Sequence, residues 1–192
     1  PTKYFIVCAN ALGSCYGSTG PSNEHVANYQ RGIQFPLITV EDMVKAHQLL
    51  ADELGIQSIH TLIGPSLGGQ QAVEWAAQEP SRFENLILIA TNAQHSPWGI
   101  AFNESQRLAL LSDETFRANL QGGGKFGLKT ARSIAMLSYR SYDGYGIPQK
   151  EDFPYKCDKF RSASYQQYQG DKFVKRFDAY AYWTLTKAMD SH

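Results

Sequence analysis

The residues with the strongest chemical signal run from Gly64 to Gly68 and read Gly-Pro-Ser-Leu-Gly. A serine with small residues two places before and two places after it is the pattern of a nucleophile elbow, a sharp turn from a strand into a helix. The small residues are required because these two positions approach each other closely. The turn lifts the hydroxyl of Ser66 from the sheet edge and points the N–H of Leu67 at the group under attack. We therefore predict a nucleophile at Ser66 and an oxyanion donor at Leu67, rather than an ordinary Gly-rich turn.

A second oxyanion donor is expected from the loop that follows an earlier strand. The segment Asn10-Ala11-Leu12-Gly13 follows the first apolar run of the chain and lies at that place. The backbone N–H of Leu12 is our candidate. The alternative is that Asn10 and Gly13 only form a turn.

A serine nucleophile also needs a base and an acid that orients it, and in this architecture they follow the serine in the order Asp or Glu, then His. The histidines after Ser66 are His95 and His192. The first follows a strand too early in the chain, and the second has no later element to hold its ring, so neither suits the role. The simplest interpretation is that the chain lacks strands at its start and the acid and histidine at its end.

The elements that must position these residues alternate between strand and helix. Continuous apolar runs predict buried strands at 4–9 and 85–91, and the short, mostly apolar segment 58–63 predicts another strand. Helical spacing predicts a helix at 39–54 closed by Gly55, and another at 67–78 stopped by Pro80. Residues 13–35 are expected to form a long loop. This alternation predicts an α/β fold with a parallel sheet.

The second half of the chain has a different character. We predict a partial α/β core with the elbow over residues 1–97 and a helical lid subdomain over residues 98–192. Helical patterns occur at 103–111, 128–138, 164–169 and 172–189, and the polar stretch 142–162 separates two of them. No strand is expected there.

Composition excludes several classes of protein. The 192 residues are 43% hydrophobic, and 18 basic residues balance 18 acidic ones, so a nucleic-acid or membrane partner is not expected. No apolar run approaches the ~20 residues of a membrane span. The three cysteines show neither pairing nor zinc-ligand spacing, and no metal site is expected. With no recognisable secretory signal, we expect a cytoplasmic protein.

Several ordered landmarks give the chain a specific resemblance. They are Asn10–Pro21, Phe35–Asp42, Gly68–Ala76, Trp98–Arg107, Ser138–Ser141, Tyr168–Gly170 and Ala188–His192. With them, nearly the whole chain resembles the homoserine O-acetyltransferase family of α/β-hydrolase-fold acyltransferases. Two departures stand at the elbow, where Pro65 and Leu67 replace the glycine and methionine common in that family.

The resemblance implies transfer of an acetyl group from acetyl-CoA to the hydroxyl of L-homoserine, on the route to methionine, through a seryl acyl-enzyme at Ser66. It also implies that Arg107 binds the substrate carboxylate, as a guanidinium can with two parallel hydrogen bonds. Tyr139 is a candidate pocket residue or part of the lid core. Transfer to serine, transfer of a succinyl group, a plain esterase and a non-catalytic binding protein are the alternatives.

The helical half is expected to cover the site and exclude water from the acyl-enzyme. In the resembled family such helices also form much of a homodimer interface. That would account for exposed aromatic side chains at Tyr180, Tyr182 and Trp183. The alternative is that these aromatics pack in the core of the lid itself.

Overall fold

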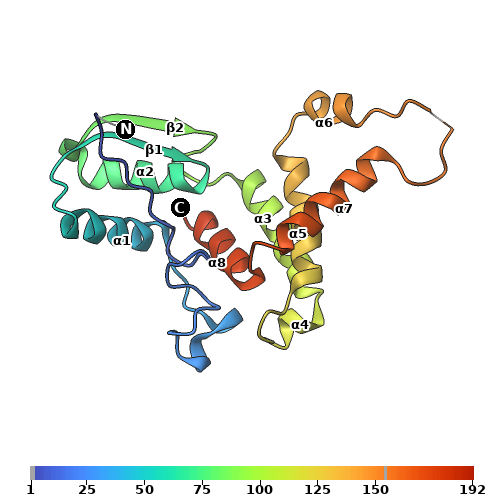
Figure 1. Cartoon of the computed structure of the whole chain (residues 1–192), viewed down its shortest axis with the longest axis horizontal. Coiled ribbons are helices and arrows are strands. Elements are labelled where there is room, and N and C mark those ends of the chain that lie inside the picture. Colours follow the sequence, from blue (N-terminus) through green and yellow to red (C-terminus); the bar gives the residue numbers. More distant parts are fainter. Residues whose placement is uncertain (1–2, 154) are drawn as a thin grey trace.

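Helices and strands alternate through the first half of the chain, and helices follow in the second half (Figure 1). The structure is a computed structural model and describes residues 3–153 and 155–192. Its strands are β1 (Ile59–Pro65) and β2 (Phe83–Ile89). Its α-helices are α1 (Val40–Glu53), α2 (Leu67–Gln78), α3 (Pro97–Leu111), α4 (Glu114–Arg117), α5 (Lys125–Ser138), α6 (Tyr142–Gln149), α7 (Arg161–Val174) and α8 (Ala179–Asp190). Short 3₁₀ helices span Asn28–Gln30, Gly32–Gln34 and Pro80–Arg82.

The two strands pair in parallel, as the alternation predicted, with Ile63 beside Ile87 and Pro65 beside Ile89. Both α1 and α2 lie on the same side of this sheet (Figure 1). Val44, Ala51 and Trp75 from these helices form an apolar cluster against which Leu62 and Phe83 pack. On this face the helices cover β1, whereas Leu86 and Leu88 of β2 remain about two-fifths exposed.

The boundaries of α1 follow from its capping residues. The Thr39 side chain accepts a hydrogen bond from Asp42 N, and Asp42 in turn accepts one from Thr39 N, which completes a capping box. After the helix Gly55 has a φ of +69°, a conformation that glycine adopts without strain. The predicted helix end at Gly55 is thus confirmed.

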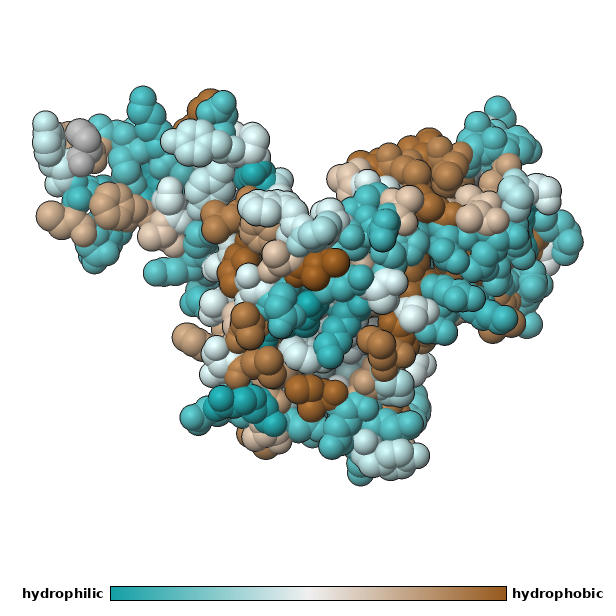
Figure 2. Space-filling view, turned by 180° about the vertical axis from the view of Figure 1, so that it is seen from behind, coloured by the Kyte–Doolittle hydropathy of each residue, from teal (hydrophilic) through white to brown (hydrophobic). Residues whose placement is uncertain are grey.

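The expected burial of the strand at 85–91 is wrong, because Leu86, Ile87, Leu88 and Ile89 of β2 are all more than two-fifths exposed. Ile63, Ile87 and Ile89 are all more than two-fifths exposed. Side chains alternate between the faces of a sheet, so these three lie on the face away from α1 and α2. Viewed from behind, apolar side chains gather at the end of the molecule that carries the sheet (Figure 2).

The predicted strand at residues 4–9 is also wrong, because these residues form no strand and Phe5 is 78% exposed. An apolar run shows that a segment suits a sheet, but a strand also requires a partner edge. Among the described residues, no segment pairs with 4–9.

The helical half has its own core. Helix α5 packs against α3 and α7. Leu110, Phe116, Leu128 and Phe173 are buried together there. As expected, residues 98–153 and 155–192 contain no strand. The polar stretch expected after residue 142 does contain a helix, α6.

The expected single helix at 172–189 is interrupted. Helix α7 ends at Val174, and Asp178 begins α8 by accepting a hydrogen bond from Ala181 N through its side chain. The extended backbone of Asp178 interrupts the helix, although the apolar spacing in the sequence continues through this position. Helical spacing alone could not reveal this break.

Of the three aromatic residues of α8 expected to be exposed, Tyr180 and Tyr182 are buried and Trp183 is partly buried. Tyr180 and Tyr182 are at most 8% exposed, and both belong to the core of the helical half. The ring of Tyr180 stacks on Phe116, with 4.8 Å between centroids. The alternative interpretation, a lid core, is correct for these two tyrosines.

Helix α8 joins the two halves of the chain. Its Ala188 is buried with Ile38 and Met43, and Leu12 and Leu67 pack against the same cluster. The last helix thus shares an apolar cluster with both predicted oxyanion segments. None of the helices described is long and apolar enough to cross a membrane.

Candidate active site

Ser66 occupies the corner between β1 and α2. Its φ of +52° and ψ of −123° lie outside helical and extended backbone, in a region that a serine adopts only under constraint. The residue is exposed. The predicted sharp turn from strand into helix is therefore present, with the serine at its tip.

The small residues around Ser66 are a steric necessity. A Cβ atom on Gly64 would overlap the carbonyl oxygen of Gly68 and lie 2.7 Å from Gly69 Cα. These contacts are with backbone, which cannot move aside as a flexible side chain could. The close approach inferred from the sequence pattern is confirmed.

Two hydrogen bonds hold the corner against β2 and the loop after it. Ser66 N donates to Ile89 O at 2.9 Å, and Thr91 Oγ1 donates to Ser66 O at 2.8 Å. Such bonds offset the strain of the serine backbone, which costs about 1–3 kcal/mol. They leave the hydroxyl of Ser66 outside the described hydrogen bonds.

The two predicted oxyanion segments lie close together. Leu12 and Leu67 pack against one apolar cluster, although 54 residues separate them in the sequence. Within the described part of the chain, the backbone N–H groups of both residues have no hydrogen-bond acceptor. Their role as oxyanion donors stays a prediction, and the free amides are compatible with it.

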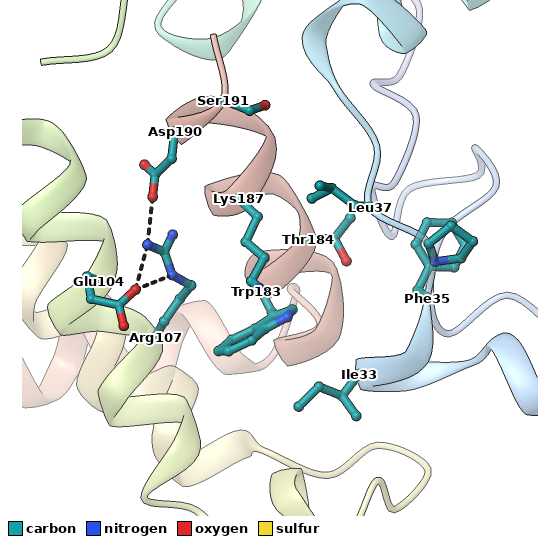
Figure 3. Close-up of a pocket in the computed structure, with 11 residues that line it drawn as sticks. Ile33, Phe35, Leu37, Glu104, Arg107, Trp183, Thr184, Lys187, Asp190 and Ser191 are labelled. Atoms are coloured by element: carbon teal, nitrogen blue, oxygen red, sulfur yellow. Dashed lines mark hydrogen bonds and ion pairs between the residues drawn. The ribbon is translucent and has the colours of Figure 1, made fainter.

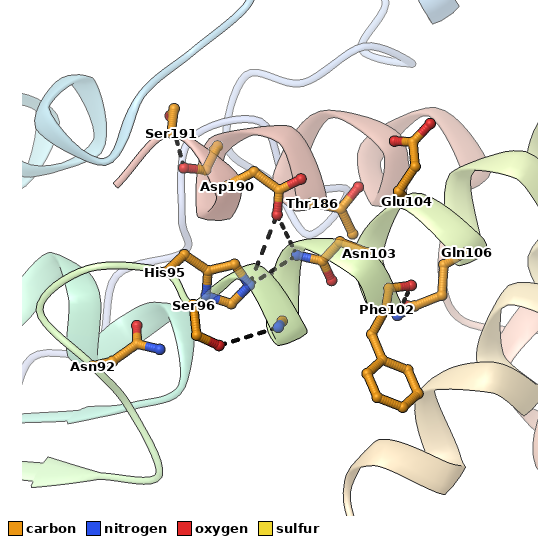
Figure 4. A network of polar contacts seen from close by, with 12 residues as sticks. Asn92, His95, Ser96, Phe102, Asn103, Glu104, Gln106, Thr186, Asp190 and Ser191 are labelled. Atoms are coloured by element: carbon orange, nitrogen blue, oxygen red, sulfur yellow. Dashed lines mark hydrogen bonds and ion pairs between the residues drawn. The ribbon is translucent and has the colours of Figure 1, made fainter.

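No described histidine is within hydrogen-bond distance of Ser66. The ring of His95 faces Asn103 and Asp190 (Figure 4). His192 accepts a hydrogen bond from His95 N at its carbonyl oxygen, and its Nε2 is buried without a described partner. The structure therefore brings no general base to the predicted nucleophile.

Arg107 is buried in an ion-pair network between α3 and α8 (Figure 3). Its Nη2 lies 2.6 Å from Asp190 Oδ2 and 2.7 Å from Glu104 Oε2, and its Nε donates to Glu104 Oε2 at 2.8 Å. Its Nη1 is buried and has no partner among the described residues. One guanidinium nitrogen is thus unpartnered but enclosed, and the expected pair of parallel hydrogen bonds to a substrate would require a neighbouring carboxylate to move.

An open pocket of about 410 Å³ lies beside this arginine. Trp183 and Lys187 form part of its wall, with the ammonium group of Lys187 4.5 Å from the Trp183 ring centroid. Phe35 and Leu37 lie across the pocket (Figure 3). The pocket therefore combines an apolar wall with positive and negative groups.

Tyr139 is not among the residues that line this pocket. It follows α5, is 62% exposed, and has the guanidinium of Arg132 5.4 Å from its ring centroid. This exposure contradicts a place in the lid core. Its role in a pocket stays a prediction.

Asp190 and Asn103 are the site residues that sequence reasoning missed. Asn103 Nδ2 donates to Asp190 Oδ1 at 2.7 Å (Figure 4). Asn103 lies four residues before Arg107, so helical spacing could have placed both on one face of α3. The partnership with Asp190 spans 83 residues and has no local signal.

Comparison with known proteins decides the family. The alpha/beta hydrolase fold family matches residues 1–183 of the chain. The chain belongs to this family. Among α/β hydrolase fold proteins, the corner at Ser66 has the place and shape of a nucleophile elbow.

Relatives of known name agree with the resemblance seen in the sequence. The chain is 48% identical to a homoserine O-acetyltransferase of Cyclobacterium marinum and 42% identical to one of Nostoc punctiforme. Both alignments cover the whole chain and 55% of the relative. The chain therefore spans about half the length of these proteins.

A solved structure gives the same result. The crystal structure of homoserine O-acetyltransferase from Staphylococcus aureus has a TM-score of 0.70 and 34% identity to the chain. The match covers 95% of this chain and 48% of that one. The resemblance to homoserine O-acetyltransferases is confirmed.

Proposed function

We propose that the protein transfers an acetyl group from acetyl-CoA to the side-chain hydroxyl of L-homoserine, with Ser66 as the nucleophile. The observation that carries this proposal is the strained, exposed corner at Ser66, in a chain that is 48% identical to a homoserine O-acetyltransferase. Proteins of this fold catalyse many reactions, so the fold alone does not identify the substrates. The corner at Ser66 supports acyl transfer, and the relatives support homoserine and acetyl-CoA as the substrates.

In the proposed reaction, Ser66 Oγ attacks the thioester carbonyl of acetyl-CoA. Negative charge develops on the carbonyl oxygen, where the free N–H groups of Leu67 and Leu12 would stabilise it. The C–S bond breaks and CoA leaves as the thiol. The hydroxyl of homoserine then attacks the acetyl-serine ester, which releases O-acetylhomoserine and restores the serine.

A base must take the proton of Ser66 Oγ in the first step and that of the homoserine hydroxyl in the second. Neither His95 nor His192 bonds to Ser66. We propose that residues outside these 192 supply the base and its acid. The whole protein, rather than this chain alone, is thus the proposed catalyst.

Arg107 is the proposed anchor for the carboxylate of the acceptor. Its free Nη1 can donate to a carboxylate oxygen, and Lys187 adds positive charge at the same pocket. A charge-assisted hydrogen bond of this kind contributes about 1.5–3 kcal/mol. Holding the acceptor near the ester favours transfer over hydrolysis because water is excluded and the hydroxyl is aligned.

The first test is Ser66→Ala in the whole protein. We expect no acetyl-enzyme by intact mass spectrometry after mixing with acetyl-CoA, and at least about a thousandfold loss of transfer. Alanine adopts the same backbone as serine, so circular dichroism should be unchanged. Ser112→Ala, which removes only an exposed hydroxyl bonded to Leu108 O, is the matched control. An acetyl-enzyme in the alanine variant would refute the nucleophile.

The second part of the test compares substrates. Acetyl-CoA and succinyl-CoA are each paired with homoserine and with serine, and kcat/KM decides between the pairs. Highest kcat/KM for acetyl-CoA with homoserine supports the proposal. A plain esterase would instead hydrolyse p-nitrophenyl acetate at a rate that homoserine does not change.

We also propose a cytoplasmic homodimer that forms through the helices after residue 97. Tyr180 and Tyr182 are buried and cannot supply such an interface, but Phe126, Tyr142 and Ile147 are each more than 70% exposed. Exposed apolar side chains of this size are typical of interaction surfaces. Sedimentation of the whole protein measures its oligomeric state.

A further inference from the structure

Asp190 lies at the centre of a polar network with His95 and Asn103 (Figure 4), and it also pairs with Arg107. Its Oδ2 accepts from Arg107 Nη2 at 2.6 Å, and its Oδ1 accepts from Asn103 Nδ2 at 2.7 Å. His95 Nε2 lies 3.2 Å from Asn103 Nδ2 and 3.8 Å from Asp190 Oδ1. Each oxygen of this carboxylate therefore has its own partner.

We propose that Asp190 is a positioning residue, which fixes the Arg107 guanidinium so that Nη1 alone is presented to the acceptor carboxylate. This inference rests on the proposed function of the same site. Asp190 itself does not touch the reacting atoms. It acts through the orientation of Arg107.

Burial distinguishes Asp190 from the other carboxylate on Arg107. The Asp190 side chain is 16% exposed and that of Arg107 is 6% exposed, whereas the Glu104 side chain is 53% exposed. Solvent screens an exposed ion pair, so such a pair contributes little to holding a side chain in place. The buried pair with Asp190 should dominate the orientation of the guanidinium.

One nitrogen of the Arg107 guanidinium has no described partner, although it is buried. Glu104 occupies Nε, and Glu104 and Asp190 share Nη2, so only Nη1 is unpartnered. Without the charge of Asp190, Nη2 keeps a single exposed partner. The guanidinium can then turn about its side-chain torsions, and the free nitrogen loses its fixed direction.

The network also anchors Asp190 to the segment beside the corner. His95 N donates to His192 O at 2.9 Å, which ties the end of α8 to the loop after β2. The same loop contains Thr91, which bonds to Ser66 O. One connected segment thus carries both the hydrogen bond to the nucleophile corner and the contacts that hold Asp190.

The kinetic test uses Asp190→Asn in the whole protein, because asparagine keeps the shape of aspartate and removes its charge. We expect the KM for homoserine to rise about tenfold, with the rate of acetyl-enzyme formation from acetyl-CoA unchanged. Asp190→Glu restores the charge and should recover part of the loss. Asp171→Asn is the matched control. The Asp171 carboxylate on α7 pairs with Lys129 on α5, and neither residue lines the pocket beside Arg107.

A double-mutant cycle separates positioning from general damage to the fold. Arg107→Lys alone should raise the KM for homoserine far more than that for acetyl-CoA. If Asp190 acts through Arg107, adding Asp190→Asn to Arg107→Lys raises that KM little further. The proposal would be overturned if the fold-changes in the KM for homoserine multiplied in the double variant. It would also be overturned if Asp190→Asn raised the KM for homoserine and the KM for acetyl-CoA equally.

A spectroscopic measurement on the whole protein does not depend on activity. The Arg107 Nε–H signal in a ¹⁵N–¹H spectrum is assigned by its loss in Arg107→Lys. We expect Asp190→Asn to shift this signal and speed its exchange with water, and Asp171→Asn to leave it in place. An unmoved signal overturns the positioning role. A shifted signal in a whole protein that lacks transferase activity would instead refute only the proposed function.

Discussion

At the scale of single residues, the corner at Ser66 shows how sequence spacing encodes backbone geometry. The glycine at 64 is needed because Gly68 O occupies the space of a Cβ atom, and the serine at 66 holds a φ of +52°. Both features follow from one sharp turn, which is local in sequence. Local constraints of this kind can be predicted from a pattern of five residues.

Gly64→Ala tests the steric part of this account. We expect the unfolding free energy to fall by about 1–3 kcal/mol or more, because the new methyl group meets backbone atoms of α2. Urea unfolding followed by tryptophan fluorescence measures it. Gly146→Ala is the control, because a Cβ there meets nothing within 4 Å and alanine favours the helix by about 0.5–1 kcal/mol. Equal stability of the two variants would contradict the close approach.

The network at Arg107 could not be predicted in the same way. The sequence indicated a role for Arg107 only through resemblance, because an arginine on a helix is usually solvated. Its burial arises from a partner on α8, and nothing near position 107 indicates that partner. The burial and hydrogen bonding of Arg107 therefore depend on a residue far away in the sequence, which the local pattern does not indicate.

At the scale of elements, prediction succeeded where an element carries its own signals. Helix α2 begins and ends at the predicted residues because the elbow precedes it and Pro80 follows it. Prediction failed for residues 4–9, whose state depends on a neighbouring strand. It also failed for the junction between α7 and α8, where Asp178 caps a new helix inside a continuous apolar pattern.

The burial of Tyr180 in α8 predicts loss of stability at alkaline pH. Desolvation raises the pKa of Tyr180 from 10.0 to about 12, and its hydroxyl donates to Leu120 O at 2.9 Å. Above pH ~10 the unfolded chain releases this proton while the folded chain keeps it, so the unfolding free energy falls as pH rises toward ~12. Below pH ~10 this contribution is fully present.

Tyr180→Phe is the variant that checks this pH dependence. It should cost about 1 kcal/mol at neutral pH through the lost hydrogen bond, and its unfolding free energy should decline less steeply between pH 10 and 12. Urea unfolding across that range, with phenolate absorbance as a second observable, gives both quantities. Tyr142→Phe is the control because Tyr142 is 93% exposed. Parallel pH profiles for wild type and Tyr180→Phe would contradict the assignment.

At the scale of the whole molecule, α1 and α2 cover one face of the sheet over β1, and the opposite face is open. Parallel sheets are usually covered on both faces, and this expectation led to the prediction of buried strands. The pairing and direction of β1 and β2 could be predicted from the alternation of elements. The exposure of Ile63, Ile87 and Ile89 could not, because burial depends on what packs above the sheet rather than on the strand itself.

The open face predicts self-association of the 192-residue chain. Ile87→Thr combined with Ile89→Thr should reduce hydrophobic dye binding and light scattering at high concentration. The unfolding free energy should change by less than about 1 kcal/mol, because both side chains are roughly half exposed. Leu62→Thr, on the covered face, should instead destabilise the fold without lowering scattering. Unchanged scattering in the double variant would contradict association through this face.

Helix α8 also has a consequence for the order of events during synthesis. Leu12 and Leu67 pack against a cluster that includes Ala188 of this helix, and Arg107 forms its buried ion pair with Asp190 of the same helix. As the chain leaves the ribosome, β1, α2 and β2 end 90 or more residues before this helix begins. Contacts so distant in sequence close late. A nascent chain that stops before residue 179 therefore holds a finished turn at Ser66 but an unassembled pocket, and proteases would meet the chain first in that state.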